Sequence, residues 1–113
     1  MASKEELFDT AVDLFGEGKV DEAIAVYREA LEIDPDYVDA LHGLAMAYAN
    51  KQKFDDAIAV GKRVCELTPE DVLAHTSLSM FYQQKGMIPE AEAEGAKARM
   101  LDWKRQLRGE GES

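Results

Sequence analysis

The residues whose side chains could do chemistry are few and widely separated. The chain has two histidines, His42 and His75, and one cysteine, Cys65. The histidines lack the His-Glu-x-x-His spacing of a zinc-binding helix. The sequence places no histidine as a base beside Cys65, which a cysteine nucleophile would need. We therefore predict no metal site and no cofactor, and we expect Cys65 and His75 to be packing residues.

Three glutamates, Glu90, Glu92 and Glu94, alternate along a predicted helix. Alternate positions of a helix do not share a face, so we do not expect these carboxylates to form an acid–base pair. The sequence also lacks a glycine-rich loop of the kind that binds phosphate. It predicts a protein that is not an enzyme.

Composition narrows the class of protein further. The chain has 113 residues, the size of a single domain over 1–113, and 23 acidic against 13 basic side chains give a net charge of -10. Nucleic acids and anionic membranes attract basic surfaces, so neither is an expected partner. No signal peptide or membrane span is visible. A lone cysteine fits a reducing compartment, and we predict a cytoplasmic protein.

The elements that must position these residues follow from an internal repeat. Pro35 and Pro69 are 34 residues apart. Leu41, Leu44 and Tyr48 have helical spacing, and Pro35 and Pro69 end the first two helix pairs. We expect no strand and six helices, over about 4–16, 21–33, 37–50, 54–67, 71–85 and 89–107. The same offset relates Ala23, Ala57 and Ala91; Leu14, Tyr48 and Tyr82; and Ile33, Leu67 and Leu101.

The spacing of Leu44-Ala45, Tyr48, Ala57 and Pro69 resembles the tetratricopeptide repeat (TPR), and the resemblance covers 4–103 in three copies. It implies an all-α, right-handed superhelix of three helix-turn-helix repeats, at about 4–37, 38–71 and 72–105, with the last helix extended as a cap. Residues 109–113 are expected to be disordered.

Two departures from the family pattern concern the second helix of a repeat. Its usual aromatic residue is kept as Tyr27 but becomes Gly61 and Gly95 in the later copies. These glycines leave room, so the later repeats are expected to pack more loosely or to accept bulkier neighbours.

In TPR folds the first helix of each repeat lines a concave groove that binds peptides, and the resemblance implies the same here. Two interpretations stay open: the groove accepts an amphipathic helix or extended apolar segment, or its first-repeat residues close the hydrophobic end of a short stack. The predicted groove residues are Phe8, Val12, Phe15, His42, Met46, Ala49, Asn50, Leu73, Thr76, Ser77, Met80 and Gln83.

One group of TPR proteins grips an acidic C-terminal carboxylate with lysine, arginine and asparagine side chains. The corresponding places here hold Phe8, Val12, Gly43, Leu73 and Ser77, none of which is basic. We therefore predict that this chain does not bind chaperone tails in that way.

Charge is uneven along the chain. Residues 1–34 carry three basic and ten acidic groups, whereas 97–108 carry five basic groups against one acidic group. The basic end could complement the helix dipole, attract the acidic end of another copy, or contact RNA through a short patch. Met100, Trp103 and Leu107 share a helix face there, which either forms the cap or, with Arg105, a self-association surface.

The function predicted from these patterns is a non-catalytic protein-interaction module. Its partner is another protein, held as an apolar or amphipathic peptide or helix in the groove, with His42, Asn50 and Gln83 supplying orienting hydrogen bonds. The alternative is a self-assembling scaffold, a homo-oligomer formed through head-to-tail or C-terminal helix contacts.

Overall fold

The computed structural model describes residues 1–109, and the rest of the tail expected to be disordered lies outside the described residues. No strand occurs in this range, and every helix boundary lies within one residue of its predicted position. No helix among these residues combines the length and apolar character that a bilayer crossing demands. The helices are α1 (Lys4–Gly16), α2 (Val20–Ile33), α3 (Val38–Asn50), α4 (Phe54–Leu67), α5 (Val72–Lys85) and α6 (Ile88–Leu107).

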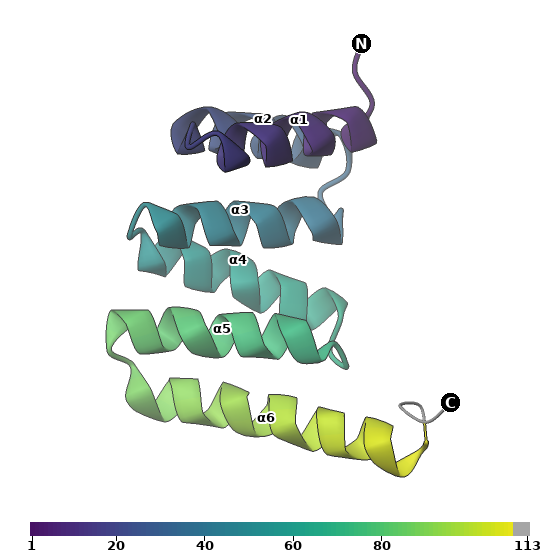
Figure 1. Cartoon of the computed structure of the whole chain (residues 1–113), viewed down its shortest axis with the longest axis vertical. Coiled ribbons are helices and arrows are strands. Elements are labelled where there is room, and N and C mark those ends of the chain that lie inside the picture. The colour runs from purple at the N-terminus through teal and green to yellow at the C-terminus, as the bar shows by residue number, and fades with distance from the viewer. Residues whose placement is uncertain (110–113) are drawn as a thin grey trace.

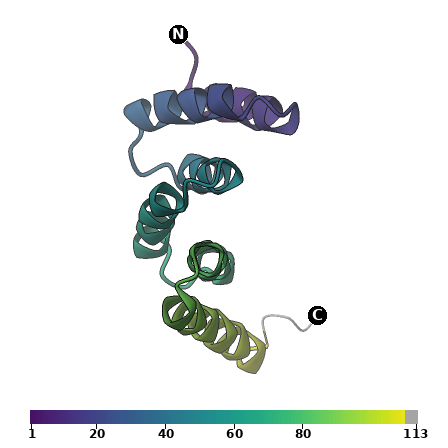
Figure 2. The same cartoon turned by 90° about the vertical axis from the view of Figure 1, so that its left-hand side faces the viewer.

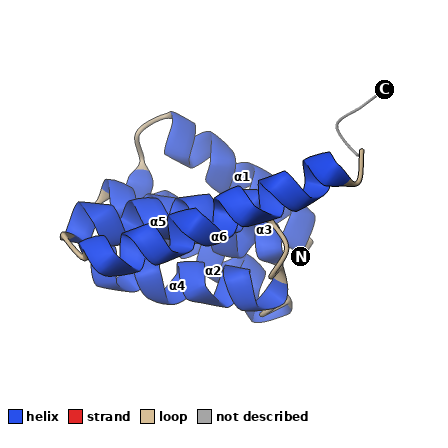
Figure 3. Cartoon of the chain, turned by 90° about the horizontal axis from the view of Figure 1, so that it is seen from below, coloured by secondary structure: helices blue, strands red, loops and turns tan. Residues whose placement is uncertain are grey.

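The helices form three antiparallel pairs stacked in chain order (Figure 1). The closest packing is within each pair, and α2 with α3 and α4 with α5 join one pair to the next. Figure 2 shows α3 and α4 side by side and α6 running below α5. The predicted all-α fold is confirmed. The extension of the last helix is confirmed as well, because α6 has 20 residues and the other helices have 13 or 14 (Figure 3).

Local signals account for where individual helices begin and end. The hydroxyl of Ser3 accepts a hydrogen bond from the Glu6 backbone N–H, and the Glu6 carboxylate accepts one from the Ser3 N–H, which forms a capping box at the start of α1. Asp71 caps α5 in a similar way by accepting from the Leu73 N–H. Gly86 ends α5 with φ of 88°, a left-handed conformation that favours glycine.

Small side chains let the paired helices approach each other. Ala11, Ala23 and Ala57 are fully buried at helix contacts. The largest fully buried side chain is Phe81, on α5. A Cβ at Gly61 would lie 3.3 Å from the Phe81 ring, so the space left by this glycine is filled by a bulkier neighbour from the next repeat.

Candidate functional site

An apolar pocket of about 390 Å³ opens between α1, α3 and the start of α5. Its lining is mostly apolar, and it contains no lysine or arginine. Its lining residues are Phe8, Val12, Phe15, Tyr27, Val38, Asp39, His42, Gly43, Met46, Val64, Asp71 and Leu73. We call this pocket the groove.

Aromatic packing forms the floor of the groove. The Phe8 ring lies 6.1 Å from that of Tyr27 and 5.7 Å from that of Tyr37, both tilted. Tyr27 can occupy this place because Gly43 has no side chain: a Cβ there would come within 2.5 Å of the Tyr27 ring. Burial raises the pKa of Tyr27, so its phenol is neutral at physiological pH and the floor is uncharged.

The rim of the groove is acidic. Asp39, in the first turn of α3, and Asp71, the cap of α5, both line it. Val12 and Leu73 are 44% and 58% exposed, so apolar surface is open to a partner beside these carboxylates. The groove therefore offers apolar contact together with negative charge.

Six of the predicted groove residues line this pocket: Phe8, Val12, Phe15, His42, Met46 and Leu73. The remaining six lie elsewhere, and their role as partner contacts stays a prediction. They are buried (Ala49 and Ser77), half-buried against the core (Met80) or exposed at the ends and sides of helices (Asn50, Thr76 and Gln83).

The predicted self-association residues lie on the far end of the stack. Met100, Trp103 and Leu107 are 57%, 60% and 71% exposed, an uncommon amount for large apolar side chains on one helix face. Arg105 lies beside them and pairs with Asp102 at 2.7 Å. More than half of the surface of each of these three residues is therefore open to solvent.

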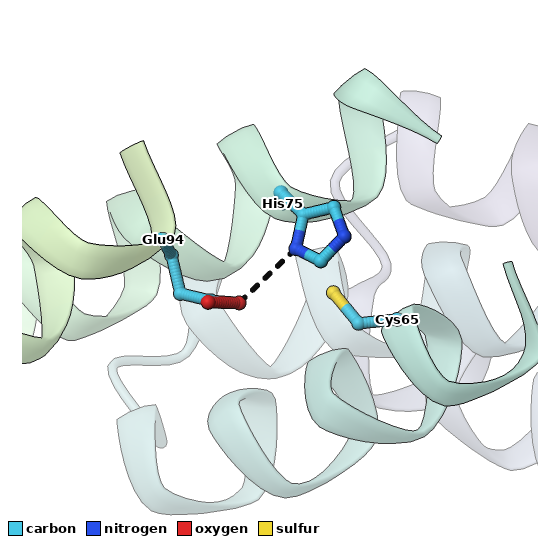
Figure 4. Close-up of side chains that lie close together, drawn as sticks. All are labelled: Cys65, His75 and Glu94. Carbon is cyan, nitrogen blue, oxygen red and sulfur yellow. Dashed lines mark hydrogen bonds and ion pairs between the residues drawn. The ribbon is translucent and has the colours of Figure 1, made fainter. Parts of the chain in front are cut away.

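A second cluster of polar side chains lies where α4, α5 and α6 meet, and the sequence did not predict it. Cys65, His75 and Glu94 come from these three helices and point toward one another (Figure 4). His75 and Glu94 are 6% exposed each, and Cys65 is partly buried. One ligand atom from each residue lies within 4.8 Å of the others. We call these residues the Cys-His-Glu cluster.

The cluster opens into a pocket of about 500 Å³. Glu90 and Glu94 both line this pocket, because residues four apart on a helix share a face. The expectation that none of the three glutamates share a face was therefore wrong for this pair. Lys62, Glu66 and Lys97 are the other charged residues of the lining.

Hydrogen bonds define the protonation of the cluster. His75 Nε2 lies 2.8 Å from the Pro69 carbonyl oxygen, which can only accept, so Nε2 carries a proton. Nδ1 lies 3.2 Å from a carboxylate oxygen of Glu94. Burial by itself raises the pKa of Glu94, but hydrogen bonds from Lys97 and His75 outweigh it and the net pKa lies below its ordinary value. Glu94 is therefore ionised, and its carboxylate can accept a hydrogen bond from His75 Nδ1.

This arrangement does not activate Cys65 as a nucleophile. Burial, with a smaller contribution from Glu94, raises the pKa of the Cys65 thiol to about 11, so the thiol keeps its proton at neutral pH. Both ring nitrogens of His75 are engaged by other groups, so neither can accept the thiol proton. The three residues resemble a catalytic triad in composition but not in their hydrogen bonds.

Comparison with known families decides the classification. A family model described as "Tetratricopeptide repeat" matches residues 14–76, more than half of the chain. The chain belongs to the tetratricopeptide repeat family. TPR domains are protein-interaction modules.

Solved TPR structures share this fold. The chain superposes on the crystal structure of MamA with a TM-score of 0.88 at 24% sequence identity. The match covers 93% of this chain but only 61%, about three fifths, of the MamA chain. The second TPR domain of Spaghetti (RPAP3), bound to HSP90 peptide SRMEEVD, gives a TM-score of 0.82 at 22% identity, covering 88% of this chain and 92% of that one.

A third similar structure is the type III secretion translocator chaperone SycD of Yersinia enterocolitica, with a TM-score of 0.82 and 21% identity over 87% of this chain and 74% of that one. No curated protein sequence matches the chain. The likeness at these identities is one of fold.

Proposed function

We propose that this TPR chain is a non-catalytic adaptor that holds a basic, apolar segment of another protein in its groove. The single observation that supports the proposal is the lining of the groove, which combines exposed apolar surface with two aspartates and no basic residue. The proposal treats 1–113 as one domain of three repeats and places it in the cytoplasm, where the free thiol of Cys65 is stable.

Apolar burial is the proposed source of affinity. An amphipathic helix or extended strand laid across Val12, Met46 and Leu73 would remove apolar surface from water, at about 25 cal/mol for each Å² buried. Phe8 and Tyr27 are already fixed by ring packing. A preformed floor lowers the ordering cost of binding, so more of the contact energy appears as affinity.

Charge is the proposed source of selectivity. Asp39 and Asp71 would attract lysine or arginine side chains of the partner, and the net charge of -10 would steer basic segments toward the protein. An acidic tail such as the HSP90 peptide SRMEEVD, which the RPAP3 domain binds, would meet repulsion here. His42, which lines the groove, could orient the partner by a hydrogen bond. The same role for Asn50 and Gln83 would need a partner that extends beyond the groove.

The test uses two labelled amphipathic peptides with the same apolar face, one with a basic and one with an acidic polar face. We expect only the basic peptide to bind in fluorescence anisotropy. The variant Val12→Lys with Leu73→Lys should weaken this binding at least about tenfold, because it removes apolar contact and opposes the partner's charge. The matched control is Ile33→Lys with Ile88→Lys, which changes side chains of similar exposure outside the groove. Equal binding by the two lysine variants would reject the groove as the site.

A second candidate function is self-assembly, and the exposed face of α6 favours it. Met100, Trp103 and Leu107 expose apolar surface beside basic residues, while the acidic first repeat lies at the opposite end of the stack (Figure 1). A head-to-tail contact between copies would bring the two together.

Sedimentation velocity over a range of protein concentrations distinguishes this candidate from the groove. We expect assembly to produce a concentration-dependent rise in mass that added salt reduces and that Trp103→Ser or Arg105→Glu removes. Lys53→Glu, which makes the same charge change in an exposed turn, is the control. A monomer at every concentration would eliminate self-assembly and leave the groove proposal untouched.

A further inference from the structure

We propose that Cys65, His75 and Glu94 form a binding site for a divalent transition-metal ion, with zinc as the ion that their donor atoms suit best. The site lies at the junction of α4, α5 and α6. It goes beyond the adaptor function, because its pocket and the groove share no lining residue.

The geometry is close to that of a metal centre. Zinc binds sulfur, nitrogen and oxygen ligands at about 2.0–2.3 Å, which in a tetrahedron places ligand atoms roughly 3.3–3.7 Å apart. His75 Nδ1 and a Glu94 carboxylate oxygen are already 3.2 Å apart. The ligand atoms of all three residues lie within 4.8 Å of one another, so they would need to close by only about 1 Å to reach the spacing of a tetrahedral site.

The second nitrogen of His75 is held as metal ligands usually are. A metal-bound histidine donates its other ring N–H to a carbonyl or carboxylate, which fixes the ring and its tautomer. His75 Nε2 donates to the Pro69 carbonyl oxygen at 2.8 Å. This bond leaves Nδ1, which faces Glu94, as the nitrogen that could bind a metal ion. Glu94 is oriented in turn by Lys97, whose Nζ lies 2.9 Å from its other oxygen.

Metal binding would displace protons from the ligand atoms. A divalent ion would form bonds to the Cys65 thiolate sulfur, His75 Nδ1 and one Glu94 oxygen, and the thiol proton, with any proton on Nδ1, would leave to solvent. The Lys97 ammonium, 2.9 Å from the other Glu94 oxygen, would remain beside the site.

The pocket supplies access and a fourth ligand position. Its volume of about 500 Å³ admits a water molecule beside the three side chains, which a three-ligand zinc site needs to complete a tetrahedron. A thiolate and an imidazole disfavour magnesium and calcium, which prefer oxygen ligands. The other charged lining groups, Lys62, Glu66 and Glu90, contribute one positive and two negative charges.

Cobalt(II) is the probe for the site, because a bound thiolate gives an intense near-ultraviolet charge-transfer band. Cys65 is the chain's only cysteine, so such a band reports this residue alone. We expect the 113-residue protein to bind one cobalt ion per chain with this band, zinc to abolish the band by displacement, and calorimetry across buffers to show proton release on binding. In nitrogen NMR, the His75 Nδ1 resonance should shift on zinc binding while the Nε2–H is retained.

Variants identify the ligands. Cys65→Ser should remove the charge-transfer band, and Glu94→Gln should weaken cobalt binding at least about tenfold. Glu90→Gln lines the same pocket outside the cluster, and His42→Asn removes the only other histidine, so both controls should bind as the wild type does. Circular dichroism of each variant confirms that its helices are intact.

The proposal is overturned if the folded wild type gives no thiolate band at excess cobalt. A band that persists when zinc is added in excess would also reject it, as would one ion shared between two chains. Equal affinity of Glu94→Gln and Glu90→Gln would reject Glu94 as a ligand and the three-residue site with it. None of these outcomes bears on peptide binding in the groove.

Discussion

A methyl group added at Gly43 tests the packing of the groove floor. On helix propensity alone, Gly43→Ala should stabilise α3 by about 1 kcal/mol. The structure predicts the opposite, because the new Cβ would lie 2.5–2.6 Å from three atoms of Tyr27, which is 3% exposed. Overpacking a buried site typically costs 1–3 kcal/mol, and a clash with a rigid ring should cost about 3 kcal/mol, which exceeds the gain in helix propensity. We expect a net loss of ~2 kcal/mol.

Thermal and urea denaturation followed by circular dichroism measure this loss, which corresponds to a fall in Tm of roughly 8 °C for a chain of this size. Gly16→Ala is the matched control, since a Cβ there meets nothing within 4 Å, and it should leave stability unchanged or slightly raised. In a Tyr27→Leu background, Gly43→Ala should no longer destabilise. A Gly43→Ala protein as stable as the wild type would refute the account of Tyr27 as the fixed floor.

Three further predictions concern stability. Glu94→Gln should lower the free energy of unfolding at neutral pH by about 1–3 kcal/mol, because it leaves the partners of a buried carboxylate unpaired. Since the folded-state pKa of Glu94 is below its ordinary value, the wild type should lose stability as pH falls from about 5 through that pKa, and urea titrations should show the gap to the variant narrowing. Ser3→Ala should cost about 1 kcal/mol through loss of the capping box, whereas Ser3→Asp, which keeps a capping oxygen, should not. Phe81→Ala should cost roughly 3–5 kcal/mol, against about 0.5 or less for Trp103→Ala at an exposed position, as measured by chemical denaturation.

The fold was predictable because its signals are local and repeated. Proline, glycine and alanine at fixed offsets limit where each helix can begin and end, and every boundary agreed within one residue. Half of the expected groove residues do line one pocket. The others do not, because a helix in a stack turns some of its positions toward the next pair. Ser77 and Ala49 are buried for this reason.

The Cys-His-Glu cluster was missed because its members are 10 and 19 residues apart on three different helices. No motif has this spacing, and the contact depends on how three helices cross. One signal was present: His75 occupies the repeat position that Leu7 and Leu41 hold in the first two copies. A polar residue at a core position requires a partner.

Two ion pairs recur in the stack with the period of the sequence. Lys51 pairs with Asp21, and Lys85 pairs with Asp55. Each pair joins the C-terminal end of a repeat's first helix to the start of the second helix in the preceding repeat. Both pairs are exposed, and each adds little stability. Because the same pair recurs at both junctions between repeats, a second copy of 38–71 inserted after the first could form the same ion pair with each of its neighbours. A stack lengthened by this fourth repeat should keep the same helix packing, and its additional first helix would extend the surface available to a partner.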